Sequence, residues 1–109
     1  MPVDILGRAE AVKALHLREK AFVLPNPWDT GSAKMLTALG FEALATTSAG
    51  FAFSRGKGTS IGEISREEAL DHAAGIIAAT SLPVSADLEN GYGHAPEDVA
   101  ETIRLAADI

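Results

Sequence analysis

The sequence predicts an α/β fold with a parallel sheet, because short apolar runs alternate with helical segments along the chain. The order is one helix followed by three strand–helix units. Each apolar run is short enough for a buried strand, and polar or glycine residues follow each one. Parallel strands linked in this way are joined by right-handed crossovers.

The first helix is expected over residues 4–18, where Asp4 can cap a segment with apolar residues at helical spacing. The apolar run 21–24 follows and ends at a proline. This run is too short for a helix and predicts the first buried strand. The helix of the first unit is expected over 31–39, with Gly40 as its C-terminal cap.

The second unit begins with the apolar run 43–47, which predicts the second buried strand. A glycine-rich stretch over 48–62 follows it. Ser65 and Glu68 then form an S-x-x-E capping box, which predicts the start of a helix.

The third unit starts with the run 82–86, which predicts the third strand. A polar loop is expected over 87–94, and Pro96 marks the first turn of the last helix. No linker separates the units, so residues 1–109 are expected to form a single domain.

The composition fits one folded domain and excludes one large functional class. Of the 109 residues, 47% are hydrophobic and 22% are charged, whereas a disordered chain has the opposite balance. The net charge of −6 offers none of the basic character with which proteins bind nucleic acid, so no nucleic-acid partner is expected. An acidic protein can still bind an anionic substrate when a metal ion supplies positive charge.

The sequence contains no cysteine, which excludes disulfides, thiolate metal sites and a cysteine nucleophile within these residues. Its first residues lack the pattern of a signal peptide. No apolar run approaches the ~20 residues that span a bilayer. We therefore expect a cytoplasmic protein that does not bind membranes.

Polar residues follow all three predicted strands at their carboxyl ends, where parallel α/β sheets gather their functional groups. The strand interiors are almost entirely apolar. We expect three groups of residues to converge on one rim: Asn26 and Asp29, then Ser48, Ala49 and Gly50, then Asp87 and Glu89.

Asp87 and Glu89 are two residues apart, so their side chains point the same way on an extended chain. Two neighbouring carboxylates repel each other unless a cation compensates, and Mg²⁺ prefers oxygen ligands. The alternative is a solvated acidic turn that leads into Gly91-Tyr92-Gly93. The D-x-E spacing is common and does not decide between a metal site and a turn.

The glycine-rich residues 50–62 match neither a phosphate loop nor the dinucleotide fingerprint, because the spacing of the glycines is wrong for both. We expect a flexible surface loop whose Arg55 and Lys57 could attract a carboxylate-bearing substrate.

The histidines and the tryptophan fit structural roles better than catalytic ones. His16 and His72 are expected at surface or packing positions on helices, and His94 in a solvated loop. Trp28 follows the first predicted strand, and we expect it to pack beneath the rim.

Four sequence blocks occur in a fixed order along the chain: Leu15-His16, Leu24-Pro25-Asn26-Pro27-Trp28-Asp29, Thr47-Ser48-Ala49-Gly50-Phe51-Ala52 and Leu82-Pro83-Val84-Ser85-Ala86-Asp87-Leu88-Glu89-Asn90-Gly91-Tyr92-Gly93. In this order and with these intervals, the blocks resemble the isocitrate lyase/phosphoenolpyruvate mutase family. The resemblance covers nearly the whole chain, and its last block is the most specific.

The resemblance implies a (βα)₈ barrel, of which this chain would supply the N-terminal part. It also implies an enzyme that uses Mg²⁺, for which Mn²⁺ can substitute, and that acts on small 2-oxo or 2-hydroxy acids. Members of the family cleave or form C–C or P–C bonds through an enolate that the metal stabilises. They include isocitrate and methylisocitrate lyases, phosphonomutases, and hydrolases or decarboxylases that act on oxaloacetate.

The family's binding residues can be carried over to matching positions in the last two blocks. Asp87 resembles the direct metal ligand, and Glu89 resembles the acidic residue that holds metal-bound water. Ser48, Ala49 and Gly50 resemble the segment that hydrogen-bonds the substrate carboxylate and the enolate oxygen. No residue of the chain is assigned as a catalytic acid or base.

Two departures from the family pattern concern the same site. The family usually has an aspartate in a G-x-P-D block after the second strand, whereas this chain has residues 56–60 (GKGTS) there and no acid before Glu63. A complete barrel also needs ~250 residues. The further acidic metal-site residue and the gating loop with the lyase cysteine would therefore lie beyond Ile109.

Two other functional classes stay open beside the enzyme. One is a non-catalytic truncated fragment or an oligomerising half-barrel, because three βα units leave sheet edges that favour association. The other is a small self-contained α/β binding domain. We expect the chain to form a homo-oligomer and to bind a small carboxylate, whether it is part of the enzyme or an oligomerising half-barrel.

Overall fold

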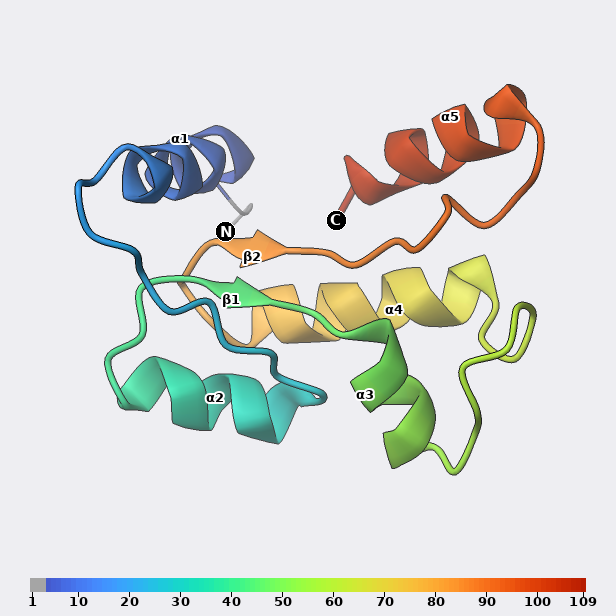
Figure 1. The fold of residues 1–109 in the computed structure, drawn as a ribbon, viewed down its shortest axis with the longest axis horizontal. Coiled ribbons are helices and arrows are strands. Elements are labelled where there is room, and N and C mark those ends of the chain that lie inside the picture. Colours follow the sequence, from blue (N-terminus) through green and yellow to red (C-terminus); the bar gives the residue numbers. More distant parts are fainter. Residues whose placement is uncertain (1–3) are drawn as a thin grey trace.

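The fold is known from a computed structural model that describes residues 4–109. Its elements in chain order are α1 (Ile5–His16), α2 (Thr30–Ala38), β1 (Leu44–Ala45), α3 (Ser48–Ser54), α4 (Arg66–Ala78), β2 (Val84–Ser85) and α5 (Pro96–Ala106). The two strands pair in parallel, with Leu44 opposite Val84 and Ala45 opposite Ser85. In Figure 1 the pair lies at the centre of the molecule, with α1 and α5 on one side and α2 on the other. The predicted α/β fold with a parallel sheet is confirmed.

Helix α4 forms the crossover between the strands and packs against α2 and α5. The predicted capping box starts it: the Ser65 hydroxyl accepts from the Glu68 N–H at 3.1 Å, and the Glu68 carboxylate accepts from the Ser65 N–H at 2.8 Å. On its inner face, Ile76 is fully buried against Leu44 and Ala33. The apolar interior of the crossover unit thus fixes how the strands lie on the helix.

The predicted ends of the other long helices are also confirmed within one or two residues. Asp4 caps α1, because its Oδ1 accepts from the Gly7 N–H at 2.9 Å. Gly40 follows α2 with a φ of +92°, a left-handed conformation that favours glycine. Pro96 occupies the first turn of α5, where a missing N–H costs nothing.

The predicted strand at residues 21–24 is wrong for the described chain, which has no regular secondary structure there. One backbone hydrogen bond connects the segment to the sheet, from the Ala45 N–H to the Pro25 carbonyl at 3.0 Å. Pro25 and Pro27 have no N–H to donate to a ladder. Val23 is 67% exposed, so little apolar burial holds this segment against β1.

The predicted loop after β1 is wrong in its first half, because residues 48–54 form the helix α3. Thr47 caps this helix, and Phe51 and Ala52 are buried with Ile64 in a second hydrophobic cluster. Burying an aromatic ring is worth about 2 kcal/mol or more, which outweighs the helix cost of about 1 kcal/mol for the glycine inside it.

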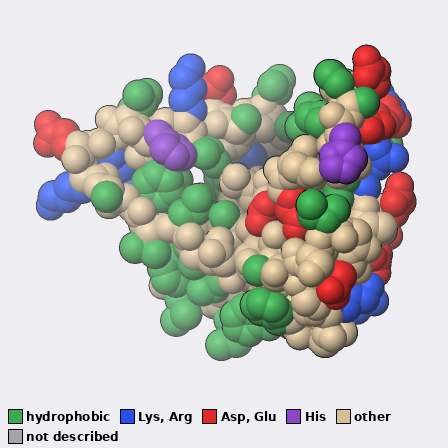
Figure 2. Space-filling model, turned by 45° about the vertical axis from the view of Figure 1, so that its right-hand side comes forward, with side chains coloured by type: hydrophobic (Ala, Val, Ile, Leu, Met, Phe, Trp, Pro, Cys, Tyr) green, Lys and Arg blue, Asp and Glu red, His purple; other side chains and the backbone are tan. Residues whose placement is uncertain are grey.

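The surface carries many large apolar side chains between charged ones (Figure 2). Among residues 4–109, the most exposed of them are Leu6, Leu17, Leu39 and Ile61. Within residues 4–109, no helix is both long enough and apolar enough to cross a bilayer.

Candidate functional site

The carboxyl ends of β1 and β2 meet at one edge, and the candidate site begins there. Directly after the paired residues, the Thr46 N–H donates to the Ser85 carbonyl at 2.8 Å. One step further, the Asp87 N–H donates to the Thr46 hydroxyl at 2.8 Å. The backbone of Asp87 is therefore tied to the end of the neighbouring strand, in the position predicted for a rim residue.

Asp87 and Ser48 are in direct contact across this edge. The Asp87 Oδ2 atom accepts from the Ser48 hydroxyl at 2.9 Å and from the Ser48 N–H at 3.2 Å. The Asp87 Oδ1 atom accepts from the Glu89 N–H at 3.0 Å. Two segments that the sequence singled out separately are thus joined in the folded chain.

These contacts favour the ionised form of Asp87. Burial acts to raise the pKa of its carboxyl, but the hydrogen bonds from Glu89 and Ser48 stabilise the ionised form. The net effect holds the pKa of Asp87 below its ordinary value. Asp87 is therefore a carboxylate at neutral pH.

A tight turn follows Asp87 and carries the second predicted carboxylate. Glu89 has a φ of 49° and Tyr92 a φ of 60°, a left-handed conformation that is uncommon for residues other than glycine. Gly91 has a φ of 87°, and a Cβ atom there would lie 2.8 Å from Val99 of α5. The Glu89 side chain is exposed. The turn thus presents Glu89 to solvent at a cost in backbone strain, as is often found at functional sites.

Tyr92 lies beside the acidic turn with its ring against the cluster around Phe51. Burial, followed by the charges of Glu89 and Asp87, raises the pKa of Tyr92 to about 12. Its hydroxyl is buried and has no hydrogen-bond partner among residues 4–109. The phenol therefore stays neutral next to two carboxylates.

Ala49 and Gly50 begin α3 beside Ser48. The Gly50 N–H is already bonded to the Thr47 hydroxyl at 3.0 Å, as part of the helix cap. Among residues 4–109, the Ala49 N–H has no such acceptor. Of the three predicted substrate-binding residues, Ser48 alone contacts Asp87, and Ala49 offers a backbone donor next to it.

The donor set of Asp87 and Glu89 fits a hard divalent cation. A carboxylate has about four lone-pair positions. Three of those on Asp87 are used, two on Oδ2 and one on Oδ1, so Oδ1 keeps one position for a cation. Within the described part of the chain, no three His, Cys, Asp or Glu side chains cluster as a complete metal site. Mg²⁺ is commonly held by one or two carboxylates and several waters, so these residues could hold it as a partial site.

The cations of the predicted surface loop are engaged within the chain. The Lys57 ammonium donates to the Glu63 carbonyl and to the Glu68 carboxylate, both at 3.1 Å. Arg55 lies over the Phe51 ring, 5.6 Å from its centre. The Glu63 carboxylate accepts from the Gly58 N–H at 2.7 Å. Glu63, the first acid after residues 56–60, therefore hydrogen-bonds the backbone of its own loop. The Lys57 ammonium is bound by Glu68 of α4.

The other predicted rim residues have structural partners. The Asn26 side-chain amide donates to the Ala45 carbonyl at 2.9 Å. Asp29 caps α2 by accepting from the Ser32 N–H at 2.7 Å, and this hydrogen bond lowers the pKa of Asp29. Trp28 is 50% exposed, so the expectation that it packs beneath the rim is wrong.

Two histidines are held by contacts away from Asp87. His72 stacks on the Phe51 ring at 3.9 Å, and its Nε2 lies 2.7 Å from the Trp28 carbonyl. The His16 Nδ1 lies 2.8 Å from the Val12 carbonyl on the same helix. His16 is exposed and His72 is partly buried, which agrees with the surface or packing positions expected for them.

Thr46 is the one residue at this edge that the sequence did not single out. It is only 7% exposed, and both its N–H and its hydroxyl contact the β2 segment. The signal available in the sequence was that Thr46 is the first polar residue after the apolar residues 43–45.

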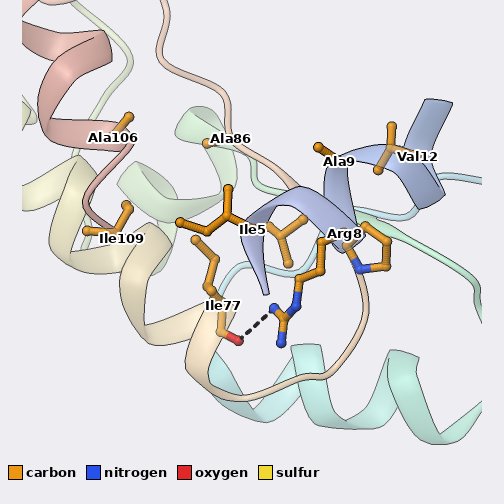
Figure 3. A pocket seen from close by; sticks show the side chains of 10 residues that line it. Ile5, Arg8, Ala9, Val12, Ile77, Ala86, Ala106 and Ile109 are labelled. Carbon is orange, nitrogen blue, oxygen red and sulfur yellow. Dashed lines mark hydrogen bonds between the residues drawn. The ribbon is translucent and has the colours of Figure 1, made fainter. Parts of the chain in front are cut away.

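A cavity of about 190 Å³ lies elsewhere, between α1, β2 and α5 (Figure 3). It is mostly apolar, with Ile5, Ile77, Ala106 and Ile109 among its lining residues. Arg8 borders it and donates to the Thr80 carbonyl at 2.9 Å. Neither Ser48, Asp87 nor Glu89 lines this cavity, so it is separate from the candidate site.

The chain matches the protein family described as phosphoenolpyruvate phosphomutase over residues 12–109. It is 30% identical over 99 residues to 2,3-dimethylmalate lyase of Eubacterium barkeri, a match that covers 91% of this chain and 34% of that protein.

Solved structures show the same similarity. The crystal structure of a candidate lyase/mutase from Burkholderia cenocepacia J2315 matches with a TM-score of 0.88 and 61% identity, over 94% of this chain and 36% of that one. Oxaloacetate acetylhydrolase in complex with its product oxalate matches with a TM-score of 0.71 and 32% identity, over 87% of this chain and 34% of that one. The chain thus spans about a third of the length of these relatives and has the fold of the corresponding part.

Proposed function

Because this chain belongs to the phosphoenolpyruvate phosphomutase family, we propose that it supplies part of an active site for small 2-oxo or 2-hydroxy acids. The reaction would break or form a C–C or P–C bond beside a carboxylate. The observation that carries this proposal is the 2.9 Å contact between Ser48 and Asp87, which are 39 residues apart in the chain. It brings together the segments expected to bind substrate and metal.

In this proposal Asp87 is the direct ligand of Mg²⁺ or Mn²⁺, and Glu89 orients water beside the ion. When bound, the ion would supply the positive charge that stabilises an enolate of the substrate. The low pKa of Asp87 supports this role, because the carboxylate is ionised before any cation arrives. The Oδ1 atom accepts one hydrogen bond, from the Glu89 N–H, so the carboxylate keeps capacity for a cation.

Ser48, Ala49 and Gly50 would bind the carboxylate of the substrate in the same proposal. The Ala49 N–H points to this role because it has no acceptor among residues 4–109. The Ser48 hydroxyl currently donates to Asp87, so it would have to rotate to donate to a substrate oxygen. Gly50 would contribute through its place in this segment, since its N–H belongs to the helix cap and Thr47 fills the place of a Cβ atom.

Oxalate is a suitable probe for this site, because it has the two adjacent oxygen-bearing carbons of a pyruvate enolate. One relative was solved with oxalate as its product, and another is a lyase that acts on dimethylmalate. Both molecules are small carboxylates, the substrate class proposed for this site.

Isothermal titration calorimetry tests the proposal with the chain as it stands. We expect oxalate to bind in the presence of Mg²⁺ and not in the presence of a chelator. Asp87→Asn should weaken the binding at least tenfold, because the neutral amide is a poor ligand for Mg²⁺. Asp71→Asn removes an exposed carboxylate from α4 and should leave binding unchanged. Equal binding by the chain and Asp87→Asn would overturn the proposal.

We also propose that the chain self-associates. Large exposed apolar residues such as Leu6 and Leu17 favour association, as does a sheet of only two strands within residues 4–109. Sedimentation velocity should show a sedimentation coefficient that rises with protein concentration. A constant value for the monomer across the concentration range would contradict this.

A further inference from the structure

Thr46 ends β1 and bonds twice to the neighbouring segment. Its N–H donates to the Ser85 carbonyl at 2.8 Å, which continues the parallel pairing by one step. Its hydroxyl accepts from the Asp87 N–H, also at 2.8 Å. Thr46 is only 7% exposed, and this second hydrogen bond is partly buried. A side-chain oxygen thus occupies the place where a backbone carbonyl would accept if the ladder continued.

The Thr46 hydroxyl supplies a third anchor for Asp87, in addition to those on the carboxylate. Ser48 holds Oδ2 and Glu89 holds Oδ1, but both contacts act on the side chain. The bond to Thr46 fixes the backbone nitrogen from which that side chain extends. The backbone N–H and both carboxylate oxygens of Asp87 thus have hydrogen-bond partners. These bonds fix the direction in which the free lone pair of Oδ1 points.

The same bond marks the start of the strained turn. The chain enters the left-handed conformation at Glu89, two residues after the anchored N–H. A residue with positive φ persists only when its surroundings hold it there. Anchoring Asp87 from the buried side stabilises the entry to this turn, and therefore the position of Glu89 as well.

We propose that Thr46 is a positioning residue, which directs the carboxylate of Asp87 toward a divalent cation through the hydrogen bond to the Asp87 backbone. This inference rests on the metal-binding role of Asp87 in the proposed function. Thr46 does not itself contact the carboxylate oxygens; its effect passes through the backbone of Asp87. Groups that orient a metal ligand typically change metal affinity about 10- to 100-fold when they are removed.

Mn²⁺ titration followed by electron paramagnetic resonance tests this, because the signal of free Mn²⁺ falls as the ion binds. Thr46→Val keeps the shape of the side chain but removes the acceptor, and we expect about tenfold weaker Mn²⁺ binding. Thr46→Ser restores the hydroxyl and should bind Mn²⁺ as the unaltered chain does. Thr80→Val is the matched control, because Thr80 is also 7% exposed, its hydroxyl also accepts from a backbone N–H, that of Leu82, and it lies after α4, away from Asp87.

The outcomes separate this inference from the proposed function. If Thr46→Val binds Mn²⁺ as tightly as the unaltered chain, or if Thr80→Val weakens binding equally, the positioning role is wrong and the metal site stands. If the unaltered chain binds no Mn²⁺, the proposed metal site fails and the inference fails with it.

Amide hydrogen exchange gives a second readout that needs neither metal nor a folded variant. In the unaltered, metal-free chain, the Asp87 N–H should exchange much more slowly than in an unfolded peptide. Exchange at the unfolded rate would show that the hydrogen bond to Thr46 is not maintained, and would overturn the inference. If Thr46→Val does not fold, Thr46→Ala removes the same acceptor with a smaller side chain and takes its place in the titration.

Discussion

At the scale of single residues, the acidic turn contains a neutral phenol between two carboxylates and a hydrophobic cluster. Tyr92 packs against the cluster around Phe51, and the charges of Glu89 and Asp87 act on its hydroxyl from the other side. Both the burial and the negative charges disfavour the tyrosinate form. Because Tyr92 is the only tyrosine in the sequence, its ionisation can be measured without overlap from another phenol.

Titration of the tyrosinate absorbance should therefore give a midpoint of about 12 in the folded, metal-free chain. In denaturant the midpoint should fall to the ordinary value of about 10. Since folding raises this pKa, the neutral phenol stabilises the fold below pH ~10, and that contribution is lost as the pH rises through the folded value. Glu89→Gln should lower the folded midpoint, whereas Glu97→Gln on α5 should not. A folded midpoint near 10 would contradict the burial of Tyr92 beside the carboxylates.

The residues of the candidate site were predictable from the sequence in part. The positions of Ser48 and Asp87 at strand ends predicted that they would meet, and the structure places them 2.9 Å apart. Thr46 was missed because a threonine at the end of an apolar run looks like part of the strand. The engagement of Lys57 was missed because its partner Glu68 is 11 residues away and is already assigned to a capping box.

At the scale of elements, helix caps explain why the boundaries could be read from the sequence. A capping residue makes its hydrogen bond within three positions, so its effect is local and needs no knowledge of the rest of the fold. This holds for Asp4 and Ser65, which mark observed helix starts. Pro96 marks the start of α5 without a capping hydrogen bond, because its fixed φ suits the first helical turn.

The capping box of α4 gives a direct test at this scale. Ser65→Ala removes the acceptor for the Glu68 N–H and should lower the free energy of unfolding by about 1 kcal/mol. Urea-induced unfolding measures this change. Ser81→Ala is the matched control, because Ser81 is exposed and its side chain makes no hydrogen bond within residues 4–109. Equal stability of the Ser65→Ala variant and the control would show that the cap does not stabilise α4.

Strand 21–24 and helix α3 show where local reasoning fails. Whether an apolar run becomes a strand depends on partners that are far away in the sequence. Here the backbone hydrogen bond to β1 is accepted by Pro25, the residue after the run, and Val23 is exposed. The glycine in α3 favoured a loop, but the burial of Phe51 against Ile64 favours the helix. Both outcomes follow from tertiary contacts that the sequence pattern does not contain.

At the scale of the whole molecule, all the candidate binding residues follow the carboxyl ends of the two short strands β1 and β2. The positions of these residues directly after predicted parallel strands predicted this arrangement, and the match to a known structure over 94% of the chain confirms the fold. The chain covers only 36% of that structure, so about two thirds of the barrel lies outside the comparison. The central claim about its function is therefore that this chain, about a third of the length of that relative, binds metal and substrate by itself.

Thermal unfolding of this chain with Mg²⁺, with oxalate, and with both together tests that claim most directly. A ligand that binds only the folded state at 100 times its dissociation constant adds ~2.7 kcal/mol to stability. We predict a cooperative transition whose midpoint rises only when both ligands are present, and no rise for Asp87→Asn. An unshifted transition, or an equal shift for Asp87→Asn, would contradict the claim that Ser48 and Asp87 form a working site in this chain.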